Sequence, residues 1–250
     1  MAKVQNPIVV IPVRLAATRL PNKPLADIQG EPMVVHVWYR AMEAAIGPAI
    51  VAVADEAIGA AVEAAGGRWV LTRADHASGS DRIFEAVSTL DPDGAHDVVV
   101  NLQGDLPLIR PEAIRTVLQP LENSEVDIAT LAAPLADAEE MADSHVVKVA
   151  MAPGENAGMG RALSFARNPA PDAGPFYHHI GLYAYRREAL QRFVGLPQSA
   201  WELAERLEQL RALDAGMRID VALVDTVPLG VDTPADLARV REWMGSGKGG

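Results

Sequence analysis

Cysteine is absent from this 250-residue sequence. The chain therefore has no disulfide bridge, no thiolate metal site and no thiol nucleophile, which suits a reducing compartment. Long apolar runs are missing too. None approaches the length of a membrane span, and the apolar stretch after "MAKVQNP" is too short for a secretory signal and lacks a cleavage pattern. These absences predict a cytoplasmic protein with no membrane partner.

The sequence also lacks several common catalytic motifs and a positive net charge. It contains no GxGxxG, GxxxxGK[ST], HExxH or GxSxG, which weakens dehydrogenase, P-loop, zinc-protease and serine-hydrolase interpretations. The 22 Lys and Arg residues against 33 Asp and Glu residues give a formal net charge of −11. A nucleic-acid partner is therefore not expected, because it requires a basic surface. A small anionic ligand is still compatible with this charge if cations gather locally.

Strand and helix patterns alternate in the first half of the chain. The run "IVVIPV" (8–13) is entirely apolar and of strand length, as in a parallel strand buried on both faces. Similar strand patterns recur three times, separated by helical patterns. Further strands are expected at 49–54, 68–71 and 97–103, and helices at 32–47, 55–67 and 82–90. The alternation predicts an α/β protein with βαβ units on a mostly parallel central sheet.

The second half has longer connections and predicts a smaller lobe with a mixed sheet. Strands are expected at 127–135, 145–153, 176–186 and 218–225. One helix is predicted over 199–216, because Ser199 and Glu202 form a capping-box pattern and Leu203, Leu207 and Leu210 form an apolar face. A last helix follows Thr233 as N-cap and Pro234 as its first residue. We expect one domain over 1–245 and a flexible tail over 246–250.

Three polar loops follow predicted strands of the parallel sheet. They are "RLAATRLPNK" (14–23), "TRADHASGSDR" (72–82) and "QGDLP" (103–107). Ligands of open parallel sheets bind outside the carboxyl ends of the strands. All three loops are therefore candidates for one cleft.

The first loop carries three cations, Arg14, Arg19 and Lys23. Such a loop can be a solvated connector, or it can bind an anion. Arg holds phosphate oxygens with two parallel hydrogen bonds, and Lys acts as a compact point charge. The position at the carboxyl end of a buried strand favours phosphate binding.

Two aspartates are candidate Mg²⁺ ligands. Asp105 follows a strand and Gly104, which allows close backbone approach, and Asp232 precedes a helix. Each also has an ordinary interpretation: Asp105 as a turn residue before Pro107, and Asp232 as a helix cap. If Thr233 is the cap instead, Asp232 is free to face a ligand.

The remaining polar candidates are not decisive by themselves. The loop 72–82 is rich in donors that suit either a base and ribose or a plain turn; its candidate residues are Thr72, Arg73, Ser78, Gly79 and Ser80. His179 lies in an aromatic strand pattern, where a histidine is usually a structural hydrogen-bonding residue. Arg167, Glu208 and Gln209 suit solvent exposure equally well.

Taken together, six motifs resemble the 3-deoxy-manno-octulosonate cytidylyltransferases, or CMP-Kdo synthetases. The resemblance runs from about Val9 to Trp243, and the motifs come in the family's order. "RLPNKPL" or "QGD" alone would be weak, because related sugar nucleotidyltransferases use similar pieces. The six are "RLAATRLPNKPL", "TRADHASGSDR", "VNLQGDLP", "HHIGLYAYR", "LEQLR" and "GVDTPADLARVR".

The resemblance implies a Rossmann-like nucleotidyltransferase fold, usually dimeric, with CTP and Kdo (3-deoxy-D-manno-octulosonate) as substrates and pyrophosphate as a product. The CMP-Kdo formed supplies lipopolysaccharide synthesis. The CTP part would span roughly 1–125, the sugar-binding and dimerisation lobe 126–220, and a metal-binding strand and helix 221–245. By this resemblance the nucleotide is bound by Arg14, Arg19, Lys23, Thr72, Arg73, Ser78, Gly79 and Gln103.

The resemblance also implies a metal and a sugar site. Asp105 and Asp232 would hold Mg²⁺, and with Arg19 and Lys23 they would be the catalytic residues. The sugar pocket would be lined by Gln103, Arg167, His179, Tyr183, Glu208 and Gln209. Arg167 would pair with the Kdo carboxylate while the C2 hydroxyl attacks the α-phosphorus. The metal is expected to activate this hydroxyl, because no protein side chain stands out as a general base.

Four positions depart from the family's pattern. Leu106 replaces a usual Glu, Ala17 a Ser, Asn22 a Gly and His178 a basic residue. Asn22 tolerates positive φ, so the loop is expected to keep its shape. The departures bear on rate and sugar preference. Open alternatives are an 8-amino Kdo analogue or a sialic-acid-type sugar as acceptor, and a non-catalytic nucleotide-binding regulator.

Overall fold

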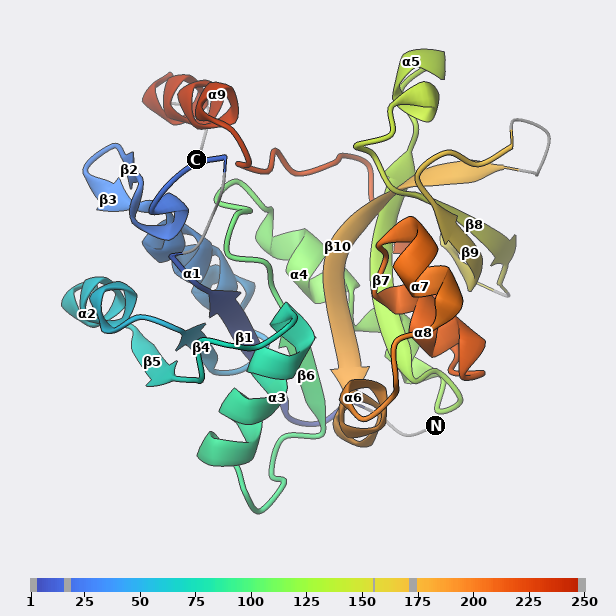
Figure 1. Ribbon diagram of the computed structural model, residues 1–250, viewed down its shortest axis with the longest axis horizontal. Helices are drawn as coiled ribbons and strands as arrows, with labels where there is room; N and C mark the ends of the chain where they lie inside the picture. The colour runs from blue at the N-terminus through green and yellow to red at the C-terminus, as the bar shows by residue number, and fades with distance from the viewer. Residues whose placement is uncertain (1–3, 16–18, 155, 171–174, 247–250) are drawn as a thin grey trace. The chain divides into compact units, whose positions relative to one another are not determined.

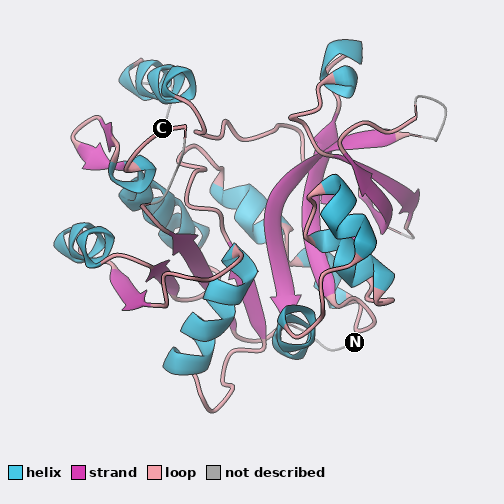
Figure 2. Cartoon of the chain, viewed as in Figure 1, coloured by secondary structure: helices cyan, strands magenta, loops and turns pink. Residues whose placement is uncertain are grey.

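A computed structural model describes residues 4–15, 19–154, 156–170 and 175–246. The chain forms two compact units (Figures 1 and 2). The N-terminal unit contains Asn6–Ile114 together with Pro228–Gly250, and the middle unit contains Met1–Gln5 together with Arg115–Val227. The boundaries between subdivisions were expected near residues 125 and 220, and the structure divides the chain at 114/115 and 227/228. Of the expected tail 246–250, residues 247–250 lie outside the described residues.

The N-terminal unit is built on a parallel sheet in the order β5-β4-β1-β6. β1 lies between β4 and β6, and its residues are buried at nearly every position, as the apolar run predicts. The observed strands lie within a few residues of the predicted ones. Their bounds are β1 Pro7–Val13, β4 Ala49–Val53, β5 Arg68–Leu71 and β6 Val98–Asn101.

Helices cover both faces of this sheet. α1 (Met33–Ala44) connects β1 to β4, and α2 (Glu56–Ala64) connects β4 to β5 in the same direction along the sheet. α3 (Gly79–Leu90) runs back from β5 to β6 and packs on β1. Right-handed connections in opposite directions place helices on opposite faces, so α3 covers the face that α1 and α2 leave. This double cover explains why the strands are apolar throughout.

Smaller elements complete the N-terminal unit. A one-turn helix, η1 (Lys23–Leu25), leads into the short hairpin of β2 (Asp27–Ile28) and β3 (Glu31–Pro32). α4 (Pro111–Thr116) ends the first stretch, and α9 (Pro234–Gly245) closes the unit. α9 is attached through a buried apolar cluster of Ile28, Met33, Val231, Leu237 and Val240.

The middle unit has a mixed sheet. β10 (Phe176–Arg186) pairs antiparallel with β7 (Ile128–Pro134) and with β8 (Lys148–Pro153). β11 (Ile219–Leu223) pairs parallel with β7 and antiparallel with β9 (Met159–Ala166), which in turn pairs with β8. Among the described strands, parallel and antiparallel pairings are therefore about equally frequent. The prediction of a mostly parallel sheet is not confirmed.

One predicted helix of the middle unit is in fact two. The segment 199–216 forms α7 (Ala200–Glu205) and α8 (Gln209–Asp214), because Arg206 adopts the left-handed region (φ 55°) and ends the first helix. The capping box of Ser199 and Glu202 is confirmed, but Leu203 is 60% exposed rather than part of an apolar face. The unit's other short helices are η2 Gln119–Glu122, α5 Ala138–Ala142 and α6 Arg187–Val194.

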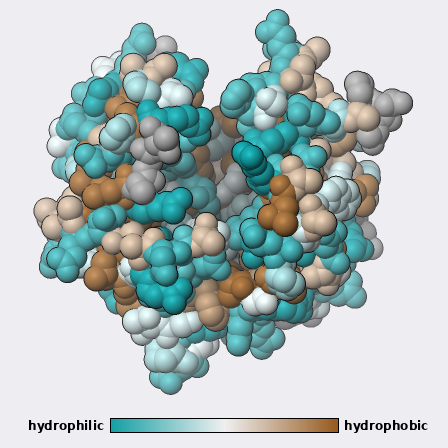
Figure 3. All heavy atoms as spheres, viewed as in Figure 1, coloured by the Kyte–Doolittle hydropathy of each residue, from teal (hydrophilic) through white to brown (hydrophobic). Residues whose placement is uncertain are grey.

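Within the described residues, the helices are too short or too polar to cross a bilayer. The face drawn in Figure 3 is mainly hydrophilic, with apolar side chains scattered among polar ones. Exposed large apolar residues include Leu71 in the N-terminal unit and Leu163 and Trp201 in the middle unit.

Candidate active site

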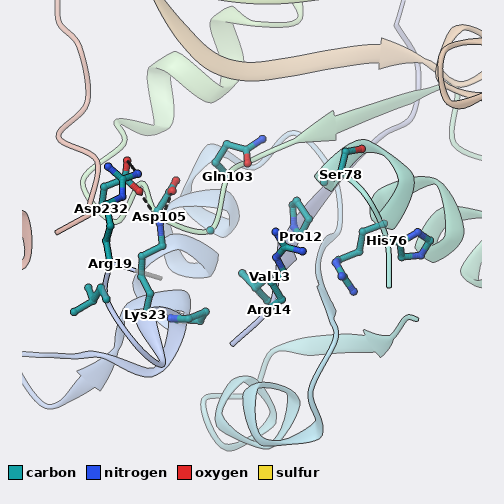
Figure 4. A pocket seen from close by; sticks show the side chains of 15 residues that line it. Pro12, Val13, Arg14, Arg19, Lys23, His76, Ser78, Gln103, Asp105 and Asp232 are labelled. Atoms are coloured by element: carbon teal, nitrogen blue, oxygen red, sulfur yellow. Dashed lines mark hydrogen bonds and ion pairs between the residues drawn. The ribbon is translucent and has the colours of Figure 1, made fainter. Parts of the chain in front are cut away.

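A polar pocket of about 390 Å³ lies in the N-terminal unit at the carboxyl ends of β1 and β6 (Figure 4). All three predicted loops contribute to it, together with the segment before α9. Eight of the predicted site residues line the pocket: Arg14, Arg19, Lys23, Ser78, Gly79, Gln103, Asp105 and Asp232. The common cleft expected from the three strand ends is therefore present.

Lys23 joins the two predicted metal ligands. Its Nζ lies 2.8 Å from Oδ2 of Asp105 and 3.1 Å from Oδ1 of Asp232. Arg19 lies 3.3 Å from the other oxygen of Asp232. Burial by itself lowers the pKa of Lys23, but the two carboxylates outweigh it and the pKa is raised. Figure 4 shows these four side chains at one side of the pocket, with Gln103 between them and Ser78.

Close backbone packing positions Asp105. A Cβ on Gly104 would lie 2.2 Å from Cγ1 of Val13 and 3.4 Å from the carbonyl oxygen of Pro12, so only glycine fits beside β1. The Asp105 carbonyl accepts a hydrogen bond from Val231 N at 2.9 Å. That bond ties the loop after β6 to the segment before α9.

Asp232 is held between a buried residue and a helix cap. Val231 is fully buried in the apolar cluster that anchors α9. Thr233 Oγ1 accepts from Asp236 N at 3.2 Å, and Asp236 accepts from Thr233 N at 2.8 Å, which completes a capping box. Thr233 and not Asp232 therefore caps α9, which leaves the Asp232 carboxylate facing Lys23 and Arg19.

The first loop is anchored at both ends. Leu15 N donates to Asp55 Oδ2 at 3.0 Å, and Asn22 adopts the left-handed region with φ 55°, as its residue type allows. Lys23 starts η1 directly after that turn, with the buried Pro24 behind it. Ala17, one of the departures from the family's pattern, lies outside the described residues.

The loop 72–82 is built largely by α3. Arg82 is only 3% exposed, and its Nη1 donates to the Thr72 hydroxyl and to the Arg73 carbonyl. Ser78 caps α3 in a reciprocal box with Asp81 and at the same time lines the pocket. Thr72 and Arg73 do not belong to the described pocket lining. Thr72 bonds instead to the Val53 carbonyl, and Arg73 pairs with Asp75.

Sequence reasoning missed two polar residues of the pocket, His76 and Arg82. His76 is nearly buried and bonds to Glu85 through Nε2. Burial lowers the pKa of Arg82, and the charge of Arg14 lowers it further. Both lie within the quoted motif "TRADHASGSDR", but nothing in their spacing showed that they turn toward the pocket. The guanidinium of Arg82 adds positive charge to the pocket, which favours an anionic ligand.

The donor set fits Mg²⁺. The described residues contain no cluster of three or more His, Cys, Asp or Glu side chains that could enclose a metal. Asp105 and Asp232 nevertheless converge on a single ammonium, so both carboxylates can reach one cation. Mg²⁺ is commonly held by one or two carboxylates with substrate phosphates and water as the other ligands. The pair therefore suits a metal that arrives with a phosphorylated substrate.

The other predicted sugar residues lie in the middle unit. The rings of His179 and Tyr183 on β10 are tilted by 51° with their centroids 5.5 Å apart, and Gln209 is buried at the start of α8. Glu208 is the N-cap residue of α8. Arg167 donates to the carbonyls of Glu205 at 3.4 Å and Ser144 at 3.3 Å. Gln103, which belongs to the N-terminal unit, bonds to Asn101 Oδ1 at 3.3 Å.

Two other departures can be placed in the structure. Leu106 is partly buried and lies beside Gly230. A Cβ added to Gly230 would lie 3.6 Å from Cδ2 of Leu106. His178 bonds through Nδ1 to the Glu140 carboxylate. Burial by itself raises the pKa of Glu140, but the hydrogen bonds with Ala136 N and His178 outweigh it and the pKa is lowered.

Comparison with known proteins matches these features to one family. A cytidylyltransferase family model covers residues 8–219. The 3-deoxy-manno-octulosonate cytidylyltransferase of Rhodospirillum centenum is 64% identical over 240 residues, which are 95% of this chain and 93% of the relative. The chain belongs to the 3-deoxy-manno-octulosonate cytidylyltransferase family. The family member from Methylorubrum populi is 60% identical over 239 residues, 94% of this chain and 96% of the relative.

Solved structures agree with the family assignment. A CMP:2-keto-3-deoxy-manno-octonic acid synthetase complexed with CTP has a TM-score of 0.89 at 40% identity, over 97% of this chain and all of that one. The 4-diphosphocytidyl-2C-methyl-D-erythritol synthase of Anaerococcus prevotii has a TM-score of 0.65 at 11% identity, over 97% of this chain and all of that one. At that identity the likeness concerns the fold alone, an α/β nucleotidyltransferase fold.

Proposed function

We propose that the protein joins CTP to Kdo and releases CMP-Kdo and pyrophosphate, with Mg²⁺ held by Asp105 and Asp232. The observation that carries this proposal is the convergence of these two carboxylates on Lys23 inside a cationic pocket. The family relatives and the CTP-bound neighbour support the choice of substrates. The alternative acceptors, an 8-amino Kdo analogue or a sialic-acid-type sugar, are not favoured by these relatives.

The cations of the pocket account for triphosphate binding. Arg14, Arg19 and Lys23 come from one loop, and Arg82 adds a fourth positive charge from α3. A triphosphate carries about four negative charges, so an attacking sugar acid would be repelled without such neutralisation. Transfer of a phosphoryl-type group depends mainly on positioning and on electrostatic stabilisation of the transition state. Arg19 and Lys23 are therefore assigned catalytic roles.

The metal would complete this charge balance. When bound at Asp105 and Asp232, Mg²⁺ would neutralise phosphate charge and lower the pKa of the attacking hydroxyl. Lys23 would then turn its ammonium from the carboxylates toward the phosphates. The serine and glycine at the start of α3 (Ser78 and Gly79) would hold the nucleoside end of CTP, with Thr72 and Arg73 shaping that loop.

The sugar acid supplies the nucleophile. The C2 hydroxyl oxygen of Kdo forms the new bond to the α-phosphorus, the bond between that phosphorus and the β-phosphate oxygen breaks, and the hydroxyl proton passes to solvent. Arg167 is assigned to the Kdo carboxylate. The other proposed sugar contacts are Gln103, His179, Tyr183, Glu208 and Gln209.

Pyrophosphate release tests the function directly. The purified full chain is incubated with CTP, Mg²⁺ and Kdo, and with the two alternative acceptors in parallel. Kdo should give the fastest release, and Asp105→Ala should remove nearly all of it. Asp93→Ala, in an exposed turn of the same unit, is the matched control and should keep full activity. If no acceptor gives pyrophosphate release above the protein-free background, the proposed reaction is contradicted, and a regulator that binds CTP without turnover is favoured.

The setting of the reaction completes the proposal. We propose a cytoplasmic homodimer that supplies CMP-Kdo for lipopolysaccharide synthesis, without a nucleic-acid or membrane partner. The absence of cysteine and the net charge of −11 support this setting. Light scattering tests the dimer, and a monomer mass at assay concentration would contradict it.

A further inference from the structure

The imidazole of His179 is held by one nitrogen only. The residue is 8% exposed, and its ring lies 5.0 Å from Phe165 and 5.5 Å from Tyr183 between ring centroids. Nε2 lies 3.0 Å from the hydroxyl oxygen of the fully buried Thr130 on the neighbouring strand β7. All of these residues belong to the middle unit.

The surroundings of Thr130 decide which nitrogen of His179 carries the proton. The hydroxyl oxygen lies 2.9 Å from the Leu182 carbonyl and 3.2 Å from the Ile180 carbonyl, at the irregularity of β10. Carbonyl oxygens only accept hydrogen bonds, and a hydroxyl has one proton to donate. Because that proton goes to a carbonyl, the hydroxyl must accept from His179. Nε2 therefore carries the hydrogen, and Nδ1 keeps a lone pair.

Nδ1 is the open end of the ring. The described hydrogen bonds of His179 give this atom no partner. Among the described residues, one fully buried side-chain nitrogen or oxygen lacks a hydrogen-bond partner, and it is Nε1 of Trp38. Nδ1 of His179 also lacks a partner but is not such an atom, so it keeps some contact with solvent. Burial, with a smaller contribution from His178, lowers the pKa of His179 to about 3. Burial also raises the pKa of the neighbouring Tyr183, so both rings are neutral at pH 7.

We propose that Thr130 is a positioning residue that fixes His179 as a neutral hydrogen-bond acceptor for a hydroxyl group of the sugar acid. This inference rests on the proposed function, which assigns His179 to the acceptor sugar. A lone pair attracts the hydrogen of a hydroxyl and repels a carboxylate, so His179 selects the hydroxylated part of the substrate. The carboxylate is left to a cation such as Arg167.

The tautomer can be measured without turnover. Long-range ¹H–¹⁵N spectra of the full chain, with ¹⁵N-labelled histidine, should show His179 protonated at Nε2 and unprotonated at Nδ1 at pH 7. His179→Gln assigns the signals by removing them. A wild-type ring protonated at Nδ1, or at both nitrogens, would overturn the proposal.

Two variants of Thr130 test its positioning role. Thr130→Ser keeps the hydroxyl and should keep the tautomer, whereas Thr130→Val removes the acceptor and should populate both tautomers. If Thr130→Val folds and its His179 signals match those of the wild type, Thr130 does not fix the ring. If it does not fold, the wild-type and Thr130→Ser spectra still decide the matter.

Substrate recognition is read from the same nitrogen. Saturation with Kdo should move the ¹⁵N signal of Nδ1 in the direction of hydrogen-bond acceptance, and an unmoved signal would contradict the hydroxyl contact. His179→Leu should raise KM for Kdo about tenfold, with KM for CTP unchanged. Kdo analogues that each lack one hydroxyl identify the group that His179 contacts. One of them should have a raised KM with the wild type but not with His179→Leu. If every analogue raises KM equally in both proteins, the contact is contradicted. Absence of turnover in the wild type would refute the proposed function while leaving the tautomer measurement valid.

Discussion

Lys23 and Asp105, 82 positions apart in the sequence, form an ion pair of 2.8 Å in the lining of the cationic pocket. The same ammonium reaches Asp232, which is 209 positions away from it. The single positive charge of the lysine offsets the repulsion between the two carboxylates. A metal bound at these two carboxylates, as proposed above, would therefore compete with the lysine for the same oxygens.

This competition predicts opposite effects of Lys23→Met on metal and substrate. Mg²⁺ should bind the variant about tenfold more tightly, because the competing ammonium is gone and two carboxylates face each other. CTP turnover should fall by about 10²-fold to 10³-fold, because a stabilising cation is lost from the transition state. Calorimetric Mg²⁺ titration and initial rates measure the two effects. Lys23→Arg, which keeps the charge, is the control, and weaker Mg²⁺ binding by Lys23→Met would contradict shared oxygens.

Gly104→Ala tests the close approach that positions Asp105. The added Cβ would meet Cγ1 of Val13 at 2.2 Å, and a β-branched side chain in a buried strand has little room to move. We expect a loss of about 1–3 kcal/mol in the free energy of unfolding, measured in urea, and slower turnover.

Two further variants make the Gly104→Ala result specific. Gly195→Ala should cost little, since its Cβ would make ordinary contacts at 3.5 Å. Adding Val13→Ala to Gly104→Ala should restore part of the lost stability by removing the clashing methyl groups. A double variant that is no more stable than Gly104→Ala would show that another contact causes the loss.

Arg211 and Glu202 form a buried ion pair between α8 and the start of α7. Their side chains are 9% and 6% exposed, and Arg211 also lies over the ring of Phe193. Arg211→Met should destabilise the protein by about 3–5 kcal/mol, because Glu202 is left as an unpaired buried charge. Arg192→Met is the matched control. It breaks a pair with Asp127 in which Arg192 is 53% exposed, so about 1 kcal/mol or less is expected.

The Glu202 pair also predicts a dependence on pH. Burial opposes ionisation of Glu202, but hydrogen bonding and the charge of Arg211 outweigh it and lower its pKa below 4.5. The unfolded chain therefore takes up this proton first, so the stabilisation is complete above pH 4.5 and is lost as pH falls through the folded pKa. Urea unfolding of wild type and of Glu202→Gln between pH 7 and 3 measures it. Parallel curves would contradict the predicted linkage.

His179 predicts a second loss of stability in acid. Burial lowers its pKa from 6.5 to about 3, so in this window the unfolded chain binds a proton that the folded protein does not. Stability should fall with decreasing pH by up to about 1.4 kcal/mol per pH unit from this group alone. His179→Asn removes the titrating ring and should give a shallower slope between pH 6 and 4. The slopes and not the absolute stabilities are compared, and equal slopes would show that His179 charges freely in the folded state.

Several elements were predictable because their signals are local. The strand 176–186 has the predicted bounds, since aromatic and apolar residues fill it continuously. The capping box at Ser199 and the N-cap at Thr233 were also predictable, because a cap needs only residues within one turn.

Other elements gave misleading signals. β9 was missed because its small residues Gly160 and Ala162 are buried, while the large apolar Leu163 is 58% exposed. The break between α7 and α8 occurs at Arg206, and arginine is not a residue type that predicts a left-handed turn. In both places packing overrides the local preference.

The candidate site shows the same division. Three of its features could be predicted from neighbours along the chain: the cationic loop at the end of β1, the glycine before Asp105 and the cap that frees Asp232. Three others required the folded chain: the meeting of Asp105 and Asp232 at one ammonium, the position of Arg82 in the pocket lining, and the position of Arg73 outside it. These contacts depend on strand order and on which helix covers which face, and those follow from the packing of the whole unit rather than from any short segment.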